Sequence, residues 1–134
     1  QTRLEQKSLD DRQEYVIQAK EIISENFWLG VGAGNYTVEV HKKYPERPIW
    51  QIQTVHNVPL LVWAELGIAG IILFIAFLVY PYILLKKTTL RFTSYGLLVT
   101  SYGLLFFDHW LWSSHFGLLL FLLMLGLVFK KEKE

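Results

Sequence analysis

Hydrophobic residues are distributed unevenly along the 134-residue chain. From Val58 to Leu85 a run of 28 residues contains Glu65 as its only charged side chain. About 20 apolar residues are enough for a helix to cross a bilayer. Two further apolar stretches follow, at 92–107 and 110–129. The pattern therefore predicts an all-α integral membrane protein in which residues 57–134 form three transmembrane helices, at about 58–85, 92–107 and 110–129.

A proline stands inside the first apolar run, at position 81. Proline has no backbone N–H, and its ring crowds the carbonyl group four residues earlier. We therefore expect the first membrane helix to kink close to Tyr80 and Tyr82.

Residues 1–56 have a polar pattern and hold 15 of the 25 charged side chains of the chain. From Tyr15 to Ile23, apolar residues recur at helical spacing between charged ones, which predicts an amphipathic helix. Ser8 is the expected N-cap of this helix and Asn26 its expected stop. The helix is expected to lie on the membrane surface or over the helix bundle.

Gly30, Gly32 and Gly34 follow as a glycine-rich turn. Their spacing lacks the third glycine of a dinucleotide-binding fingerprint, and no strand precedes them. A tight chain reversal is the favoured explanation, and an anion-binding nest of backbone amides is the alternative. A second short helix is expected from Tyr36 to Tyr44, ended by Pro45.

Two clusters of basic residues lie next to the apolar runs in the sequence. They are Lys86, Lys87 and Arg91 between the first two runs, and Lys130, Lys131 and Lys133 after the third. Because lysine and arginine are retained on the cytoplasmic side, residues 1–56 are expected outside and the C-terminus in the cytoplasm. The net charge of +1 argues against nucleic-acid binding. The absence of cysteine excludes disulfides and thiol nucleophiles.

His56 and Asn57 stand where the polar segment meets the first apolar run. Asn57 is a candidate N-cap for the membrane helix. A histidine at this level can accept a proton from a hydroxyl nucleophile, although a lone interfacial histidine is more often a satisfied polar residue. Glu65, inside the apolar run, is expected to face a partner or a water-filled cavity. Both interpretations of His56 stay open on the residues alone.

Other polar residues are weaker candidates. Arg47, in a proline-flanked loop, could contact a sugar or phosphate, and a solvated loop charge is the alternative. Asp108, His109 and His115 share a short apolar-flanked segment, but their spacing is not that of metal ligands. We therefore predict no metal site and no cofactor.

An ordered set of motifs covers residues 8–80. It comprises Arg12, Tyr15, Ala19, Ile22-Ile23, Leu29-Gly30-Val31-Gly32-x-Gly34-Asn35-Tyr36, His56-Asn57 and Glu65-Leu66-Gly67-Ile68-Ala69-Gly70. In order and spacing this set resembles the large outer loop and following span of the bacterial O-antigen ligase and polymerase superfamily. The chain departs from the family pattern at Trp28, where proline is common, and at Tyr15, where tryptophan is frequent.

The resemblance implies a multi-pass enzyme of the bacterial inner membrane. Such an enzyme transfers a glycan, without a metal, from an undecaprenyl-diphosphate-linked donor to a hydroxyl of a lipid, glycan or protein acceptor. It implies that His56 activates the acceptor and that Arg12 holds the donor diphosphate. Arg47, Glu65 and Asn57 are further candidates for substrate contacts.

The chain starts at Gln1, and its single methionine is Met124. We therefore expect it to be the C-terminal part of a longer protein whose earlier transmembrane helices are partners of this part, together with membrane lipids. The resemblance also implies a second functional arginine in an earlier outer loop. The alternative class is a non-enzymatic membrane module, such as a transporter or scaffold end domain, in which Arg12, His56 and Glu65 are satisfied polar groups.

Overall fold

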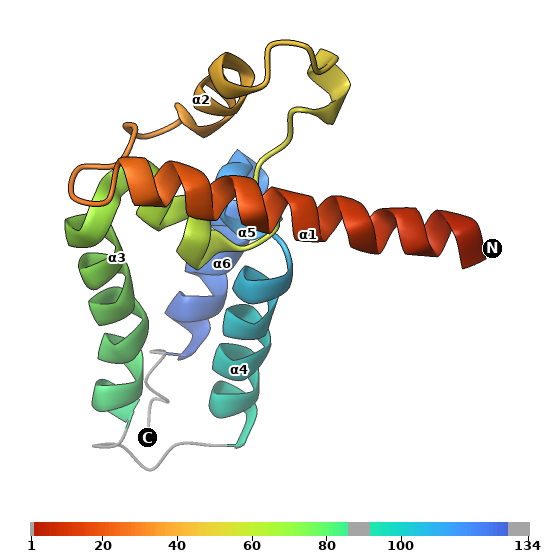
Figure 1. The fold of residues 1–134 in the computed structure, drawn as a ribbon. Helices are drawn as coiled ribbons and strands as arrows, with labels where there is room; N and C mark the ends of the chain where they lie inside the picture. Colours follow the sequence, from red (N-terminus) through yellow and green to blue (C-terminus); the bar gives the residue numbers. More distant parts are fainter. Residues whose placement is uncertain (1, 86–91, 129–134) are drawn as a thin grey trace, which may run out of the picture. The chain divides into compact units, whose positions relative to one another are not determined.

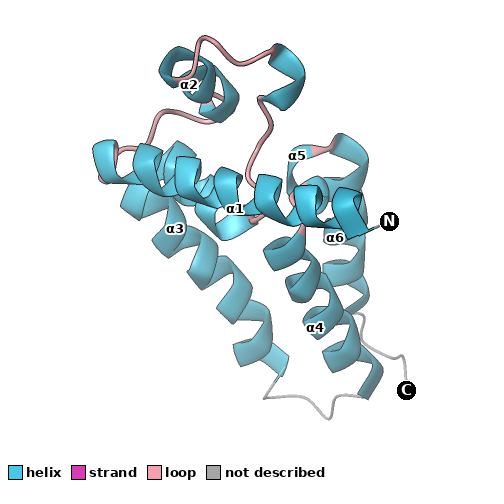
Figure 2. Cartoon of the chain, turned by 45° about the vertical axis from the view of Figure 1, so that its right-hand side comes forward, coloured by secondary structure: helices cyan, strands magenta, loops and turns pink. Residues whose placement is uncertain are grey.

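The computed structural model describes residues 2–85 and 92–128 (Figure 1). Every regular element in these two ranges is a helix (Figure 2), which confirms the all-α prediction. The elements are α1 (Thr2–Glu25), α2 (Tyr36–Lys43), the 3₁₀ helix η1 (Ile49–Gln51), α3 (Val58–Leu85), α4 (Phe92–Phe107), α5 (Trp110–Ser113) and α6 (His115–Val128). The chain divides into two compact units, Gln1–Phe74 and Ile75–Glu134, here called the first and second units.

Helix α1 begins at Thr2, so the expected start at Ser8 is wrong. Ser8 lies inside the helix because residues 3–7 are all good helix formers, so the helix extends through them to Thr2. The expected end is confirmed. The backbone N–H and the side-chain amide of Asn26 both donate to the carbonyl oxygen of Ile22, at 3.0 and 3.1 Å.

The apolar stripe of α1 is buried as predicted. Its members are Tyr15, Ala19, Ile22 and Ile23. Helix α2 packs against α1 and contributes Tyr36 and Val40, both fully buried. In both views α1 crosses the N-terminal end of α3, while α2 and η1 lie on the side of α1 away from residues 68–74 of α3 (Figures 1 and 2). The first unit is therefore layered around α1.

Helix α3 has the bounds that the apolar run predicts, but its interruption lies elsewhere. Its one residue with non-helical dihedrals is Gly67, with φ 65° and ψ −163°. Pro81 lies inside the helix and keeps helical dihedral angles, so the kink expected near it stays a prediction. Within residues 2–85 and 92–128, α3 is the one helix long and apolar enough to cross a membrane.

The second unit differs from the prediction in its last helix. The expected third span is split at Ser114, whose backbone is extended at φ −100° and ψ 141°. The Ser114 hydroxyl accepts a hydrogen bond from the Gly117 N–H at 2.9 Å and so caps α6.

The second and third predicted spans are consequently short. Helices α4 and α6 have 16 and 14 residues, or roughly 24 and 21 Å at 1.5 Å per residue. In the described part of the chain, α3 is thus the one clear candidate for a membrane span, and α4 has the predicted bounds of the second. The residues that predict the orientation (86–91 and 130–133), and Phe129 at the expected end of the third span, lie outside the described residues.

Candidate active site

The glycine-rich turn after α1 is joined to α3 through backbone hydrogen bonds. The N–H groups of Val31 and Gly32 donate to the carbonyl oxygens of Ala64 and Glu65, at 2.9 and 2.8 Å. In return, Ile68 donates its N–H to the carbonyl oxygen of Phe27 at 3.0 Å. In a continuous helix, the Ala64 and Glu65 carbonyls would bond within α3. The break at Gly67 leaves these carbonyl groups free to accept hydrogen bonds from the glycine-rich turn. The turn and the break in α3 therefore satisfy each other's backbone hydrogen-bonding groups.

Two glycines permit this close backbone contact. Gly30 and Gly67 have φ of +67° and +65°, which residues with a Cβ adopt only under strain. A Cβ at Gly30 would lie 2.6 Å from the Gly67 nitrogen, and one at Gly67 would lie 2.7 Å from the Leu29 nitrogen. The tight chain reversal is thereby confirmed. The anion-binding nest is wrong for the Val31 and Gly32 amides, because α3 carbonyls already occupy both.

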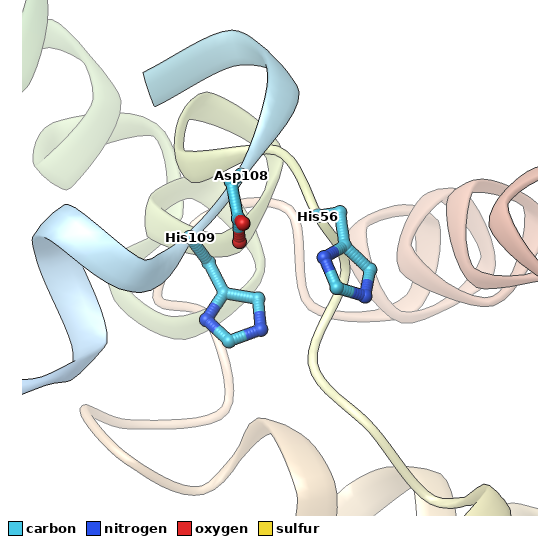
Figure 3. Close-up of side chains that lie close together, drawn as sticks. All are labelled: His56, Asp108 and His109. Atoms are coloured by element: carbon cyan, nitrogen blue, oxygen red, sulfur yellow. The ribbon is translucent and has the colours of Figure 1, made fainter. Parts of the chain in front are cut away.

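The predicted cap of α3 holds the junction where His56 lies. The Asn57 side-chain oxygen accepts the Leu60 N–H at 3.0 Å, and the Asn57 carbonyl accepts the Leu61 N–H at 3.0 Å. His56 immediately precedes this cap, on the segment that leads into α3 (Figure 3). Its half-buried ring lies beside the ring of Tyr15 on α1, with 6.0 Å between ring centroids and 38° between planes. His56 is therefore held between the start of α3 and α1.

Arg12 lies on the same helix face as Tyr15, one turn earlier. Residues three apart in a helix are about 5–6 Å apart at Cβ, so Arg12 and Tyr15 are neighbours on the surface of α1. The Arg12 side chain is exposed. The ion pairs among the described residues do not include it. The structure thus shows an exposed guanidinium on α1, three residues before the tyrosine that lies beside His56.

Arg47 has a different environment from Arg12. It forms an ion pair with Glu14 of α1, and its guanidinium lies 4.6 Å from the centroid of the Tyr44 ring. The guanidinium of Arg47 is therefore held by an ion pair and an aromatic ring, and it is not a solvated loop charge. Similar contacts fasten the end of α2 to α1, namely Tyr44 to Glu21 at 2.6 Å and Lys43 to Glu25 at 2.6 Å.

These carboxylates also affect the neighbouring phenols. Burial raises the pKa of Tyr15, the negative charges of Asp11 and Glu14 raise it further, and Arg47 opposes them. The hydrogen bond to Glu21 is the main cause that raises the pKa of Tyr44, with burial adding to it. The phenol beside His56 is accordingly neutral at physiological pH.

The remaining candidates are placed as follows. Glu65 is half-buried, in the α3 turn before the break, and its carbonyl binds the glycine-rich turn. Asp108 and His109 belong to the second unit, on the turn between α4 and α5 (Figure 3). His115 is the exposed first residue of α6.

Sequence reasoning missed three features of the first unit. It did not single out Tyr15 as the neighbour of His56. It did not identify Gly67 as a helix break, although a glycine within a helical pattern can indicate one. Gln18, one turn beyond Tyr15, is only 2% exposed, and its side-chain amide has no hydrogen-bond partner among the described residues. No sequence signal marks a buried glutamine.

A polar helical segment is thus docked on the start of an apolar helix that is long enough to cross a membrane. The chain belongs to the O-antigen ligase family, whose family model matches residues 2–75. This is a family of bacterial inner-membrane enzymes, which confirms the resemblance found in the sequence. No curated protein and no solved structure matched the chain. The matched region ends where the first unit ends.

Proposed function

We propose that this protein transfers a glycan from an undecaprenyl-diphosphate-linked donor to an acceptor hydroxyl, at the outer face of the inner membrane and without a metal. Membership in the O-antigen ligase family supports glycosyl transfer in general. The observation that supports the proposal is the contact between Tyr15 and His56, because Arg12 precedes Tyr15 by one turn of α1.

His56 is proposed to accept the proton of the acceptor hydroxyl. The hydroxyl oxygen then forms the new glycosidic bond to the anomeric carbon of the donor sugar. The bond between that carbon and the diphosphate oxygen breaks, and its electron pair leaves with the diphosphate. Imidazole suits this task because it exchanges a proton readily near neutral pH.

Arg12 is proposed to bind the departing diphosphate. A guanidinium can bridge two anionic oxygens with parallel hydrogen bonds, which an ammonium cannot do. Arg12 lines a shallow depression of α1 together with the apolar side chains of Val16 and Ile17. This mixture of a cation and apolar groups suits a diphosphate that carries a lipid chain.

The other site residues are proposed to act in supporting ways. Asn57 positions His56 by capping α3, and Arg47 positions the segment after α2 by pairing with Glu14. The half-exposed Glu65 is proposed to accept a hydrogen bond from a sugar hydroxyl. Residues 1–56 are proposed to be outside and the C-terminus cytoplasmic, with membrane lipids and further helices of a longer protein as partners. A lipid, a glycan or a protein can supply the acceptor hydroxyl.

The test compares four variants of the complete protein: His56→Ala, Arg12→Ala, Arg12→Lys and Lys20→Ala. Lys20 is an exposed cation elsewhere on α1 and is the matched control. Acid–base assistance contributes about 10² to 10⁴ in rate, so His56→Ala should reduce glycan transfer by that factor at unchanged protein abundance. Arg12→Ala should impair the same step, and Arg12→Lys should restore it only in part.

Lys20→Ala should transfer glycan at the wild-type rate. Wild-type transfer by His56→Ala at matched abundance would remove His56 from the mechanism and favour a non-enzymatic membrane module.

A further inference from the structure

The tip of the glycine-rich turn exposes two large apolar side chains. Trp28 is 73% exposed and Leu29 is 86% exposed. The preceding residue, Phe27, packs instead, with its ring edge-to-face against Trp63 of α3 at 5.4 Å between centroids. The turn therefore directs one aromatic residue toward α3 and presents the next two residues outward.

The tip cannot move away from α3 without breaking its backbone hydrogen bonds. Residues 27, 31 and 32 are bonded to residues 68, 64 and 65 of α3. Gly30 and Gly67 bring the two backbones closer than any Cβ allows. Trp28 and Leu29 consequently stay at the level of the α3 break.

The length of α3 beyond the break fixes that level. From Ile68 to Leu85 the helix has 18 residues and no charged side chain. At 1.5 Å per residue this part is about 27 Å long, close to the roughly 30 Å of a bilayer hydrocarbon core. The polar boundary of the membrane then falls near Gly67. Glu65, the one charged residue of α3, is left on the polar side of the boundary.

We propose that Trp28 and Leu29 form a lipid contact that inserts into the membrane leaflet on the side of residues 1–56. The partner is phospholipid, with the glycerol region against Trp28 and acyl chains against Leu29. Tryptophan prefers this interfacial depth because its ring is apolar and its N–H is polar. The contact holds the first unit against the bilayer and requires none of the chemistry assigned to His56.

A second exposed apolar pair serves as the internal control. Ile49 and Trp50 of η1 are 80% and 75% exposed. They belong to η1, which lies on the side of α1 away from residues 68–74 of α3 (Figures 1 and 2). Exposure is thus matched between the two pairs, and only their level along α3 differs.

The test uses the absence of native cysteine in this chain. Leu29→Cys and Ile49→Cys are introduced singly into the complete protein, with any cysteine elsewhere replaced. Each is labelled with a nitroxide and reconstituted into phosphatidylethanolamine–phosphatidylglycerol vesicles. Power-saturation electron paramagnetic resonance then measures collisions with oxygen, which concentrates in lipid, and with a water-soluble nickel chelate.

The label at Leu29 should collide severalfold more with oxygen than with nickel, and the label at Ile49 should show the reverse ratio. Nickel access at Leu29 equal to that at Ile49 would place the tip in water and overturn the proposal. Protection of Leu29 from both reagents would also overturn it, because the tip would then be covered by protein. Loss of transfer in the His56→Ala protein changes none of these outcomes, so the two proposals fail separately.

Discussion

Both units of this chain have buried apolar side chains, and the first unit adds further interactions to them. In the first unit, backbone hydrogen bonds join the glycine-rich turn to α3, and ion pairs join the end of α2 to α1. In the second unit, α4 and α6 pack through apolar side chains, among them Leu98, Leu105 and Phe121. The O-antigen ligase family model matches the first unit and ends with it.

This difference determines which substitutions each unit tolerates. Apolar residues of similar volume replace one another in a packed helix pair at small cost. A glycine with positive φ in contact with another backbone has no such substitute. Interactions that tolerate one residue type leave a recognisable motif, and interactions that tolerate many leave only an apolar composition.

The sharpest test of the comparison exchanges one glycine in each unit. Gly67→Ala places a Cβ against the Trp28 carbonyl and the Leu29 nitrogen at φ +65°. Strain and overpacking together should cost more than about 3 kcal/mol in the free energy of unfolding. Limited proteolysis should cleave the turn at residues 27–35 much faster than in the wild type.

Gly103→Ala is the matched control in α4, where a Cβ would meet nothing within 4 Å. Because alanine favours helices over glycine, this variant should be stabilised by about 0.5–1 kcal/mol. Equal stability of the two alanine variants would mean that the glycine contact does not order the first unit.

The ion pairs of the first unit should contribute less. A double-mutant cycle on Glu14→Gln and Arg47→Gln should give a coupling of about 1 kcal/mol or less, because Glu14 is partly exposed and solvent screens the pair. The Glu39–Lys42 pair within α2 is the control, since Lys42 is 67% exposed, and its coupling should be about 0.3 kcal/mol. A larger coupling at Glu39–Lys42 would contradict the role assigned to Arg47.

Among these variants, Tyr36→Phe should change the free energy of unfolding least at neutral pH. Burial raises the pKa of Tyr36 above its ordinary value of 10.0. Between these two pKa values the unfolded chain has lost the phenol proton and the folded chain has kept it. The contribution of the buried phenol to the stability of the fold is therefore fully present below about pH 10. It falls as the pH rises toward the pKa of Tyr36 in the folded chain.

Tyr36→Phe should flatten this alkaline loss of stability, as measured by denaturant unfolding between about pH 8 and pH 11. Tyr95→Phe, at an exposed site in the second unit, is the control and should leave the slope unchanged. Identical slopes for the wild type and Tyr36→Phe would show that the buried phenol does not limit alkaline stability.

Local signals in the sequence predicted much of the fold. The ends of α3 and α4, the stop at Asn26 and the cap at Asn57 were correct because each depends on neighbouring residues. The start of α1 was wrong because a good capping residue does not start a helix when helix formers precede it. The third apolar run forms two helices, α5 and α6, and not one, because a serine within the run caps a new helix.

The candidate site was predictable only in part. Arg12 and His56 came from the family pattern, and the Asn57 cap came from local chemistry. The Tyr15–His56 contact and the Glu14–Arg47 pair join residues 41 and 33 positions apart. No periodicity or spacing indicates such pairs, because they arise only when α1, α2 and the start of α3 are packed together.

The docking of the glycine-rich turn on α3 also sets an order of events during synthesis. The carbonyl groups that bind the Val31 and Gly32 amides lie 33 residues downstream. While the chain is made from its N-terminus, these amides have no protein partner until residues 64 and 65 have emerged. The glycine-rich turn therefore cannot form these hydrogen bonds to α3 until the first turns of α3 have formed. Maturation of the first unit is thus tied to insertion of the helix that follows it.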